Sequence, residues 1–219
     1  DAFIEKIRAA VKRVSPEKFL LGEVWEDATT KYGFGHRRTY LLGKGLDSVM
    51  NYPFKNAVLD FVKGKPAQQA AGEILSICEH YPAPAINTAL NFLSTHDTER
   101  ALTVIADEPA NGRGREWQSG RNVSGEAYEE GMLRLRMAYA IIYTLPGLPC
   151  LYYGDEIGMQ GYRDPFNRGY YCWDSHEERL KPVLAQLAQL RHSCEAFRTG
   201  ALRVLRAEGG VLHYQRVGA

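Results

Sequence analysis

The sequence lacks an excess of charge of either sign. Its 219 residues carry 27 Lys and Arg against 26 Asp and Glu, which gives a formal net charge of +1. The basic residues are scattered, so no segment has the electrostatic character that binds a phosphate backbone or an anionic membrane. A Gly-rich nucleotide-binding loop is also missing. We therefore expect no nucleic acid and no membrane among its partners, no cofactor, and no metal requirement.

Long hydrophobic runs and closely spaced cysteines are missing as well. No apolar run approaches the roughly 20 residues that span a bilayer, and the N-terminus has no signal-peptide pattern. The cysteines, Cys78, Cys150, Cys172 and Cys194, form no CxxC pair. This spacing argues against a zinc ribbon or a disulfide-dense secreted scaffold, and it predicts reduced thiols in or near a core. Reduced thiols favour a cytoplasmic location.

What the chain does contain is an ordinary globular composition, 45% hydrophobic and 24% charged, arranged as apolar runs that alternate with helical patterns. An amphipathic helical pattern over residues 1–14 comes first. The apolar runs, which we interpret as strands, are KFLLGEVW (18–25), LDSVMNYP (46–53), ALNFLSTHD (89–97) and LPCLYYGDE (148–156). The helical patterns that follow them occupy residues 54–64, 66–81, 127–145 and 177–192.

Strands that alternate with helices and read as continuous apolar runs predict a parallel β/α architecture with both sheet faces covered. The alternation stops near Gly200. Residues 201–217 instead form two alternating runs around Glu208-Gly209-Gly210, which predicts a hairpin and the start of an antiparallel β domain. We therefore predict a β/α domain over residues 1–199 and a β segment over residues 200–219.

Polar side chains stand where each predicted strand meets its loop. They are Glu23, Asn51, the pair His96 and Asp97, and the pair Asp155 and Glu156. In β/α folds this edge of the sheet forms the site, because the loops converge there on one mouth. Glu23 and Asp97 would then face each other, as the carboxyl groups do in glycoside hydrolysis. The last pair is expected to order the loop below the site instead of contacting substrate.

Four motifs occur in an informative order: GEVWEDA (22–28), SVMNYPF (48–54), FLSTHDTER (92–100) and GLPCLYYGDEIGM (147–159). Together they resemble the second half of the catalytic barrel of the α-amylase superfamily, and they are most similar to neopullulanases and cyclomaltodextrinases. The resemblance covers roughly residues 1–200. It implies half of a (β/α)8 TIM barrel, strands five to eight with their helices, followed by the start of an antiparallel β C-terminal domain.

The resemblance also implies roles for single residues. Glu23 matches the general acid/base and Asp97 the carboxylate that stabilises the transition state. His96 matches a histidine that hydrogen-bonds sugar hydroxyls, Trp25 an aromatic platform for a glucosyl ring, and Asn51 joins this substrate-binding set. The segment YRDPFNRGYYCW (162–173) resembles the loop after strand eight, where Asp164 and Arg168 match residues that contact sugars further from the bond.

Ordinary structural roles are the alternatives for these residues. Glu23 would be a solvated carboxylate at a strand end, His96 the brace of a loop, and Trp25 part of a core. Trp117, in the polar loop, has two interpretations: a sugar contact or the hydrophobic anchor of a lid.

The departure from the family is a missing nucleophile. The retaining mechanism needs an Asp in a Gly-x-Arg-x-Asp pattern after strand four, and the chain contains none. Two carboxyl groups about 5 to 5.5 Å apart are required, one of them as nucleophile. We therefore expect barrel strands one to four to precede Asp1. The parent would be a retaining α-glucan hydrolase or transglycosylase acting on maltodextrins, cyclodextrins or pullulan, and the isolated chain would be nearly inactive.

The expected partners are an α-glucan oligosaccharide, the missing N-terminal half of the barrel, and a second copy bound through the exposed barrel edges. Two other functions stay open at this point. One is a non-catalytic carbohydrate-binding or structural half-barrel, similar to the amylase-like ectodomains that accompany amino-acid transporters. The other is a half-barrel that serves as an assembly unit. The joint presence of Glu23, His96 and Asp97 disfavours a role without chemistry.

Overall fold

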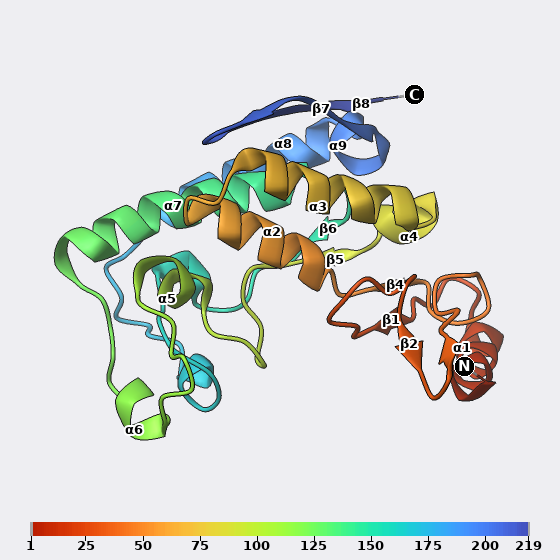
Figure 1. Cartoon of the computed structure of the whole chain (residues 1–219), viewed down its shortest axis with the longest axis horizontal. Coiled ribbons are helices and arrows are strands. Elements are labelled where there is room, and N and C mark those ends of the chain that lie inside the picture. The colour runs from red at the N-terminus through yellow and green to blue at the C-terminus, as the bar shows by residue number, and fades with distance from the viewer. Residues whose placement is uncertain (1, 219) are drawn as a thin grey trace.

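The computed structural model describes residues 2–218 (Figure 1). The helices are α1 (Ala2–Val14), α2 (Tyr52–Val62), α3 (Ala67–His80), α4 (Ala83–Asn87), α5 (Ala101–Ala106), α6 (Arg115–Gln118), α7 (Gly125–Thr144), α8 (Leu180–Ser193) and α9 (Glu195–Thr199), with 3-10 turns η1 (Asp155–Ile157) and η2 (Phe166–Arg168). The strands are β1 (Leu21–Gly22), β2 (Tyr32–Gly33), β3 (His36–Arg37), β4 (Ser48–Val49), β5 (Leu90–Asn91), β6 (Leu148–Pro149), β7 (Ala201–Glu208) and β8 (Val211–Val217). All five predicted helical segments and the C-terminal hairpin are present.

The four predicted strands pair in parallel but are much shorter than expected. β1 pairs with β4 and β5 pairs with β6, two residues each. A single parallel bridge between Met50 and Leu90 joins the two pairs. β1 and β6 each have a hydrogen-bonded neighbour on one side only. The bonds from the β6 segment to the β5 segment come from the N–H groups of Leu148 and Cys150, on either side of Pro149. Over residues 2–218 the array is open and forms no closed barrel.

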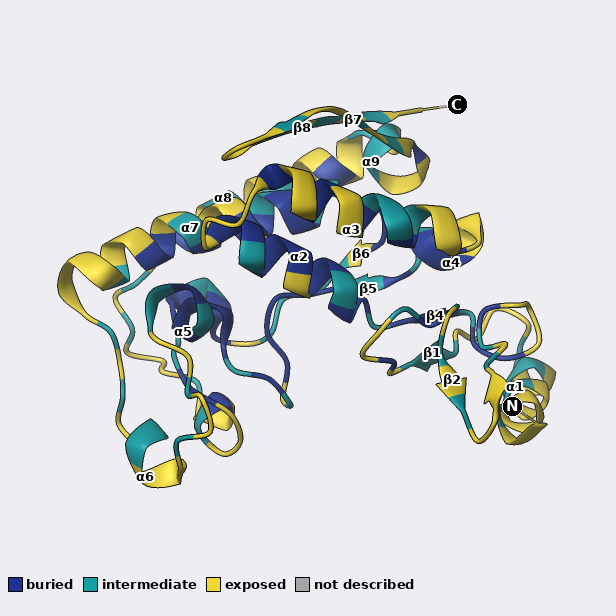
Figure 2. Cartoon of the chain, in the orientation of Figure 1, coloured by how far each residue is buried: buried dark blue, intermediate teal, exposed yellow. Residues whose placement is uncertain are grey.

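A layer of helices covers one face of this array and supplies most of the core (Figure 2). Helix α2 begins at Tyr52, where the side chain of Asn51 accepts the Phe54 N–H at 3.3 Å and caps the first turn. It ends at Val62, and Gly64, with a φ of +104°, follows the C-cap Lys63 and turns the chain before Pro66 leads into α3. Burying a large apolar side chain such as Phe54 contributes roughly 1.5–3 kcal/mol, so α2 and α3 anchor the fold.

The C-terminal hairpin packs on the outer side of this helix layer. Its strands β7 and β8 are antiparallel, and the turn contains Gly209 at φ +54°. The Gly209 carbonyl accepts the Ala67 N–H at 2.7 Å, which ties the turn to the start of α3. At the other end, Arg216 donates to the Thr144 carbonyl at 2.9 Å. A lone hairpin is marginal in water, and these contacts explain how this one is held.

The N-terminal segment differs most from expectation. Helix α1 forms over Ala2–Val14, but Phe3 and Val14 on its apolar side are 74% and 77% exposed. The helix is held by Ile4, which packs against the core, and by ion pairs, with Arg8 2.6 Å and Lys12 3.0 Å from Asp47. The small antiparallel pair β2 and β3, which follows β1, was not predicted.

Two properties bear on the environment of the chain. No helix within residues 2–218 is both long enough and apolar enough to cross a membrane. None of the four cysteines is in a disulfide; Cys172 is exposed and the other three are half-buried. Burial raises the pKa of the Cys78 thiol to about 11, so it stays protonated, as expected of a reduced thiol beside a core.

Candidate active site

Glu23 stands at the end of β1 with its carboxylate held by two neighbours. The Tyr52 hydroxyl donates to Glu23 Oε1 at 2.7 Å, and the Trp25 indole N–H donates to the same oxygen at 3.1 Å. The Trp25 and Tyr52 rings stack with centroids 4.5 Å apart at 13°, and Phe92 meets Tyr52 edge-on at 4.8 Å. Glu23 itself is exposed. The sequence therefore builds an oriented carboxylate on an aromatic support, with its second oxygen open.

The Tyr52 phenol is influenced by Asp97 as well as by Glu23. Burial raises the pKa of the Tyr52 phenol, and the hydrogen bond to Glu23 and the charges of Glu23 and Asp97 raise it further. The phenol consequently stays protonated and acts as a donor. The charges of Glu23 and Asp97 thus both act on this phenol. That the two carboxylates face each other across one site stays a prediction.

His96 and Asp97 lie on the loop after β5, in contact with η2. His96 Nε2 is 3.3 Å from Asp97 Oδ2, and Arg168 Nη2 is 3.1 Å from Asp97 Oδ1. The Arg168 Nε–H donates to the His96 carbonyl at 2.9 Å and lies 3.1 Å from Asp164 Oδ1. Four of the predicted site residues, His96, Asp97, Asp164 and Arg168, therefore form one connected group.

Asn167 is a residue that sequence reasoning missed. It is fully buried, and its Nδ2 lies 3.2, 2.8 and 2.8 Å from the carbonyls of Thr95, His96 and Thr98. One amide therefore gathers the backbone of the whole loop that carries His96 and Asp97. Its position beside Arg168 was the only signal in the sequence, because no motif distinguishes a loop asparagine that binds carbonyls 69–72 residues away.

Asn51 is placed differently from the other predicted contacts. It is fully buried, and its amide donates to Asn91 Oδ1 at 2.9 Å while its oxygen caps α2. Asn91 in turn donates to the Pro146 carbonyl at 2.6 Å. In this structure the Asn51 side chain fastens strand ends together and presents no surface to a ligand.

Trp117 is fixed by contacts on its ring. The guanidinium groups of Arg113 and Arg121 lie 3.8 and 4.2 Å from the ring centroid, and Tyr162 meets it edge-on at 5.2 Å. The half-buried ring thus organises the polar loop. Of the two interpretations of Trp117, this geometry favours the anchor.

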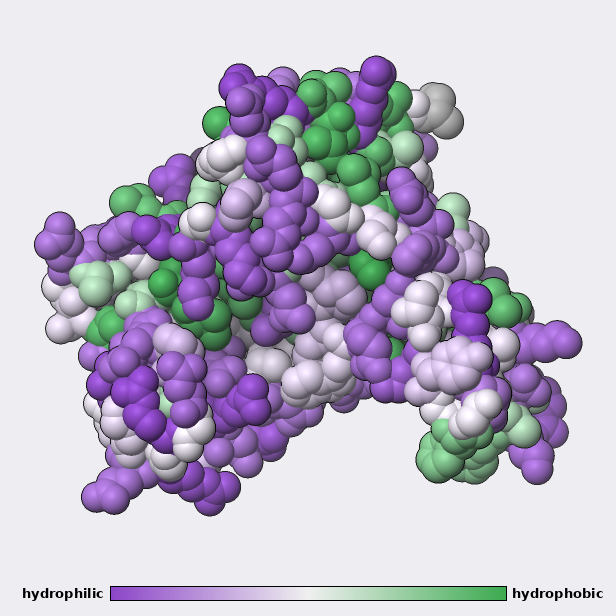
Figure 3. Space-filling view, viewed as in Figure 1, coloured by the Kyte–Doolittle hydropathy of each residue, from purple (hydrophilic) through white to green (hydrophobic). Residues whose placement is uncertain are grey.

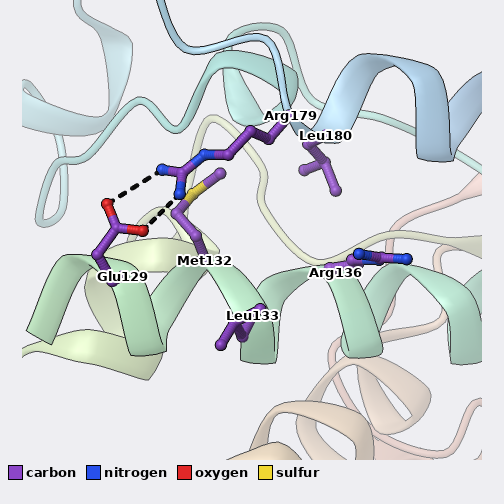
Figure 4. A pocket seen from close by; sticks show the side chains of 6 residues that line it. All are labelled: Glu129, Met132, Leu133, Arg136, Arg179 and Leu180. Carbon is purple, nitrogen blue, oxygen red and sulfur yellow. Dashed lines mark hydrogen bonds and ion pairs between the residues drawn. The ribbon is translucent and has the colours of Figure 1, made fainter. Parts of the chain in front are cut away.

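One small surface pocket lies away from these residues, between α7 and the start of α8 (Figure 4). Arg179 reaches across it to an ion pair with Glu129, and Met132, Leu133 and Leu180 supply the apolar lining. Its volume is about 80 Å³, whereas ligand pockets usually enclose roughly 300–1,000 Å³. We assign the candidate site instead to the strand ends, where the hydrogen-bonded Glu23 carboxylate and the connected group around Asp97 lie. Residues 2–218 also contain no cluster of three or more His, Cys, Asp or Glu arranged to hold a metal ion.

Comparison with known proteins gives consistent results. A family profile described as "Alpha amylase, catalytic domain" matches residues 1–199. An amylopullulanase of Thermoanaerobacter thermohydrosulfuricus is 32% identical over 225 residues, covering 95% of this chain and 14% of the relative. A cyclomaltodextrinase of Geobacillus thermopakistaniensis is 31% identical over 215 residues, covering 96% of this chain and 31% of the relative.

Solved structures resemble the chain over nearly its whole length. The cyclic α-maltosyl-(1→6)-maltose hydrolase of Arthrobacter globiformis, solved in complex with cyclic α-maltosyl-(1→6)-maltose, superposes with a TM-score of 0.79 at 27% identity. The match covers 100% of this chain and 43% of that enzyme. The chain thus spans less than half the length of each of these proteins.

Proposed function

Because the chain belongs to the α-amylase catalytic-domain family, we propose that it is the acid/base-bearing part of a retaining α-glucan hydrolase or transglycosylase. Its substrates would be maltodextrins, cyclodextrins or pullulan, in keeping with relatives named amylopullulanase, cyclomaltodextrinase and neopullulanase. The observation that carries the proposal is the Glu23 carboxylate at the end of β1, held by the Tyr52 hydroxyl and the Trp25 indole N–H.

Glu23 is the proposed general acid/base. With Oε1 held by Tyr52 and Trp25, Oε2 is free to give its proton to the glycosidic oxygen as the C–O bond breaks. In the second half of the reaction the same oxygen takes a proton from the attacking water. Fixing one oxygen aims the other, and this orientation is what makes a single carboxyl group effective in both steps.

Asp97 and His96 are proposed to stabilise the reacting sugar. Each Asp97 oxygen already has a cationic or polar neighbour, Arg168 at Oδ1 and His96 at Oδ2. These neighbours hold the carboxylate in one orientation, so its negative charge faces the positive charge that develops on the oxocarbenium-like sugar. His96 is 54% exposed in its side chain and is available to sugar hydroxyls.

The remaining predicted residues are proposed to bind or position sugar further out. Trp25, 46% exposed, offers a ring face as a platform, and Asp164 and Arg168 offer polar groups on the loop at η2. For Asn51 we propose an indirect role, since its contacts with Asn91 and α2 fix the strand end beside Glu23.

The nucleophile is proposed to come from outside this chain. Residues 1–199 would form strands five to eight of a (β/α)8 barrel and residues 200–219 the first hairpin of a β domain. The preceding half of the barrel would supply the aspartate at about 5 to 5.5 Å from Glu23 that a retaining mechanism requires. The isolated chain would accordingly be nearly inactive.

Complementation tests this function. The chain is assayed on maltotriose, cyclodextrin and pullulan, alone and after mixing with a recombinant fragment that bears the preceding strands. Glu23→Gln should abolish the activity gained on mixing. Glu26→Gln is the matched control, because Glu26 lies three residues away and pairs with Lys31. Activity of the chain alone, or full activity of Glu23→Gln, would refute the proposed mechanism, and inactivity in every mixture would favour a binding or structural role.

A further inference from the structure

Arg100 and Asp155 form a fully buried ion pair beneath the candidate site. Their side chains are 0% and 1% exposed, and Arg100 Nη1 lies 3.2 Å from Asp155 Oδ1. Asp155 belongs to η1, after β6, while Arg100 immediately precedes α5. Taking two charges out of water is costly, so their retention here requires a physical reason.

The carboxylate of Asp155 connects three parts of the fold. Its Oδ2 accepts hydrogen bonds from the Ser94 hydroxyl and the Tyr139 hydroxyl, both at 2.6 Å. Ser94 Oγ also accepts the Ala101 N–H at 2.8 Å. Ser94 and Ala101 bracket residues 95–100, so the carboxylate fastens both ends of the loop that carries His96 and Asp97.

Arg100 connects the same loop to the segments on its other side. Its Nη1 donates to the Tyr153 carbonyl at 2.7 Å, and its guanidinium lies 4.8 Å from the ring centroids of both Tyr152 and Tyr153. The Arg100 N–H donates to the Gly161 carbonyl at 2.9 Å. The Tyr153 hydroxyl then donates to the Gly169 carbonyl at 2.8 Å, one residue after η2.

The charge of Arg100 has few other partners. Its Nε and Nη2 are buried without a hydrogen-bond acceptor in the described structure. Asp155, the Tyr153 carbonyl and the two tyrosine rings therefore supply the compensation for the guanidinium. Replacing such a pair by apolar side chains is often neutral or stabilising, so net stability is a weak reason to keep it. The pair does fix the loop of residues 95–99 relative to the segment of residues 153–155.

We infer that Arg100 and Asp155 are positioning residues: the buried pair sets the conformation of residues 95–99 and so aims His96 and Asp97 at the substrate. Ser94 contacts Asp155, which pairs with Arg100. Arg100 binds the Tyr153 carbonyl, and the Tyr153 hydroxyl binds the carbonyl of Gly169, next to Arg168. Arg168 in turn pairs with Asp97. The inference rests on the proposed function for the roles of His96 and Asp97, but the conformation of the loop is measurable without activity.

The test compares three variants of the chain. Arg100→Met with Asp155→Leu removes both charges and keeps an apolar interior, so its melting temperature should stay within about 4 °C of wild type. Asp155→Asn preserves shape but removes the counter-charge, and it decides the question should the double variant fail to fold. Tyr139→Phe is the control, because it removes one hydrogen bond to the same carboxylate oxygen and leaves the pair intact.

Two readouts report on the loop in substrate-free protein. The ring signals of His96, assigned among the six histidines with His96→Gln, should move in the charge variants by more than in Tyr139→Phe, while those of His213 stay in place. The Asp97 amide, which donates to Thr95 Oγ1 at 3.1 Å, should exchange with solvent at least about tenfold faster. A folded charge variant with wild-type His96 signals and wild-type Asp97 exchange would overturn the inference. Because neither readout needs turnover, this result is distinguishable from a failure of the proposed function.

Discussion

At the scale of single residues, the orientation of Glu23 depends on one hydroxyl. Tyr52 is 2% exposed, stacked by Trp25 on one side and supported by Phe92 on the other. Because the ring is held in place, its hydroxyl stays within 2.7 Å of Glu23 Oε1 and orients that carboxylate. The contact is the residue-level basis of the proposed acid/base chemistry.

Tyr52→Phe should lower kcat in the complemented enzyme about tenfold while changing KM little, because it removes orientation of the acid and leaves the ring stack in place. Steady-state kinetics on maltotriose measures both constants. Tyr81→Phe is the matched control: it also removes a buried tyrosine contact, the 3.0 Å bond from the Ala28 N–H, but away from the site. Equal kcat values for the two variants would contradict the role of Tyr52.

Asp155 gives a prediction for stability against pH. Burial raises its pKa to about 6, although Ser94, Tyr139 and Arg100 favour the charged form. In the unfolded chain an Asp has a pKa of about 3.9. Between these values the folded state keeps the proton that the unfolded state has lost, so stability falls as pH rises from about 4 to about 6, by on the order of 3 kcal/mol.

Urea unfolding of wild type and Asp155→Asn at pH 4 and pH 7 measures this effect. As pH rises from 4 to 7, the unfolding free energy of wild type should fall relative to that of Asp155→Asn. Only wild type has to ionise a buried carboxyl group over this range. A difference that is the same at both pH values, or that moves in favour of wild type, would show that Asp155 is ionised throughout.

At the scale of elements, the polar loop between α5 and α7 has a small core of its own. Arg121 pairs with Asp107 through two contacts of 2.7 and 3.2 Å, and it covers the ring of Trp117. The Arg121 hydrogen bond also lowers the pKa of Asp107. The Tyr162 hydroxyl donates to the Glu108 carbonyl at 2.6 Å and closes the loop from the other side. Local contacts of this kind set the free energy of local opening.

Arg121→Ala should therefore open the loop without unfolding the domain. We expect chymotrypsin to cut after Trp117 about tenfold faster than in wild type, with little change in the global melting temperature. Arg115→Ala is the control on the same loop, because Arg115 is exposed and Arg121 holds the ring. Equal cleavage rates in the two variants would show that the ring contacts do not restrain the loop.

At the scale of the whole molecule, the chain exposes surfaces that a closed domain covers. β1 and β6 each present an unpaired edge, and Phe3, Val14 and Leu133 are 74%, 77% and 67% exposed. Hydrophobic side chains are visible on the surface over the hairpin and at the lower edge of the N-terminal part (Figure 3). Free strand edges and exposed apolar side chains together favour association.

We expect the isolated chain to self-associate at micromolar concentration. Light scattering coupled to gel filtration, over a tenfold range of protein concentration, should give a mass above 24.6 kDa that rises with concentration. Addition of the complementary barrel fragment should replace these assemblies with one complex. A monodisperse monomer at all concentrations would contradict the expectation.

Local patterns predicted much of the fold. Helical periodicity identified α1, α2, α3, α7 and α8, because each buries or presents one face over several turns. The two alternating runs on either side of Gly209 identified the hairpin, because side chains of a strand alternate between its two faces. The apolar runs that we interpreted as strands are longer than the strands that form, since an apolar run reports burial and does not report how many of its residues find a hydrogen-bonded neighbour. The β2 and β3 pair was missed because its residues have no alternating pattern.

By itself the sequence determined which residues stand at the strand ends, and with them the family, because both depend on short ordered motifs along the chain. Only the tertiary structure decided what those residues touch. Tyr52 reaches Glu23 from 29 residues away, Asn167 holds a loop some 70 residues before it, and Asn51 turns inward. These contacts join segments that the chain separates, so they follow from packing and burial in three dimensions and leave no periodic signal in the sequence.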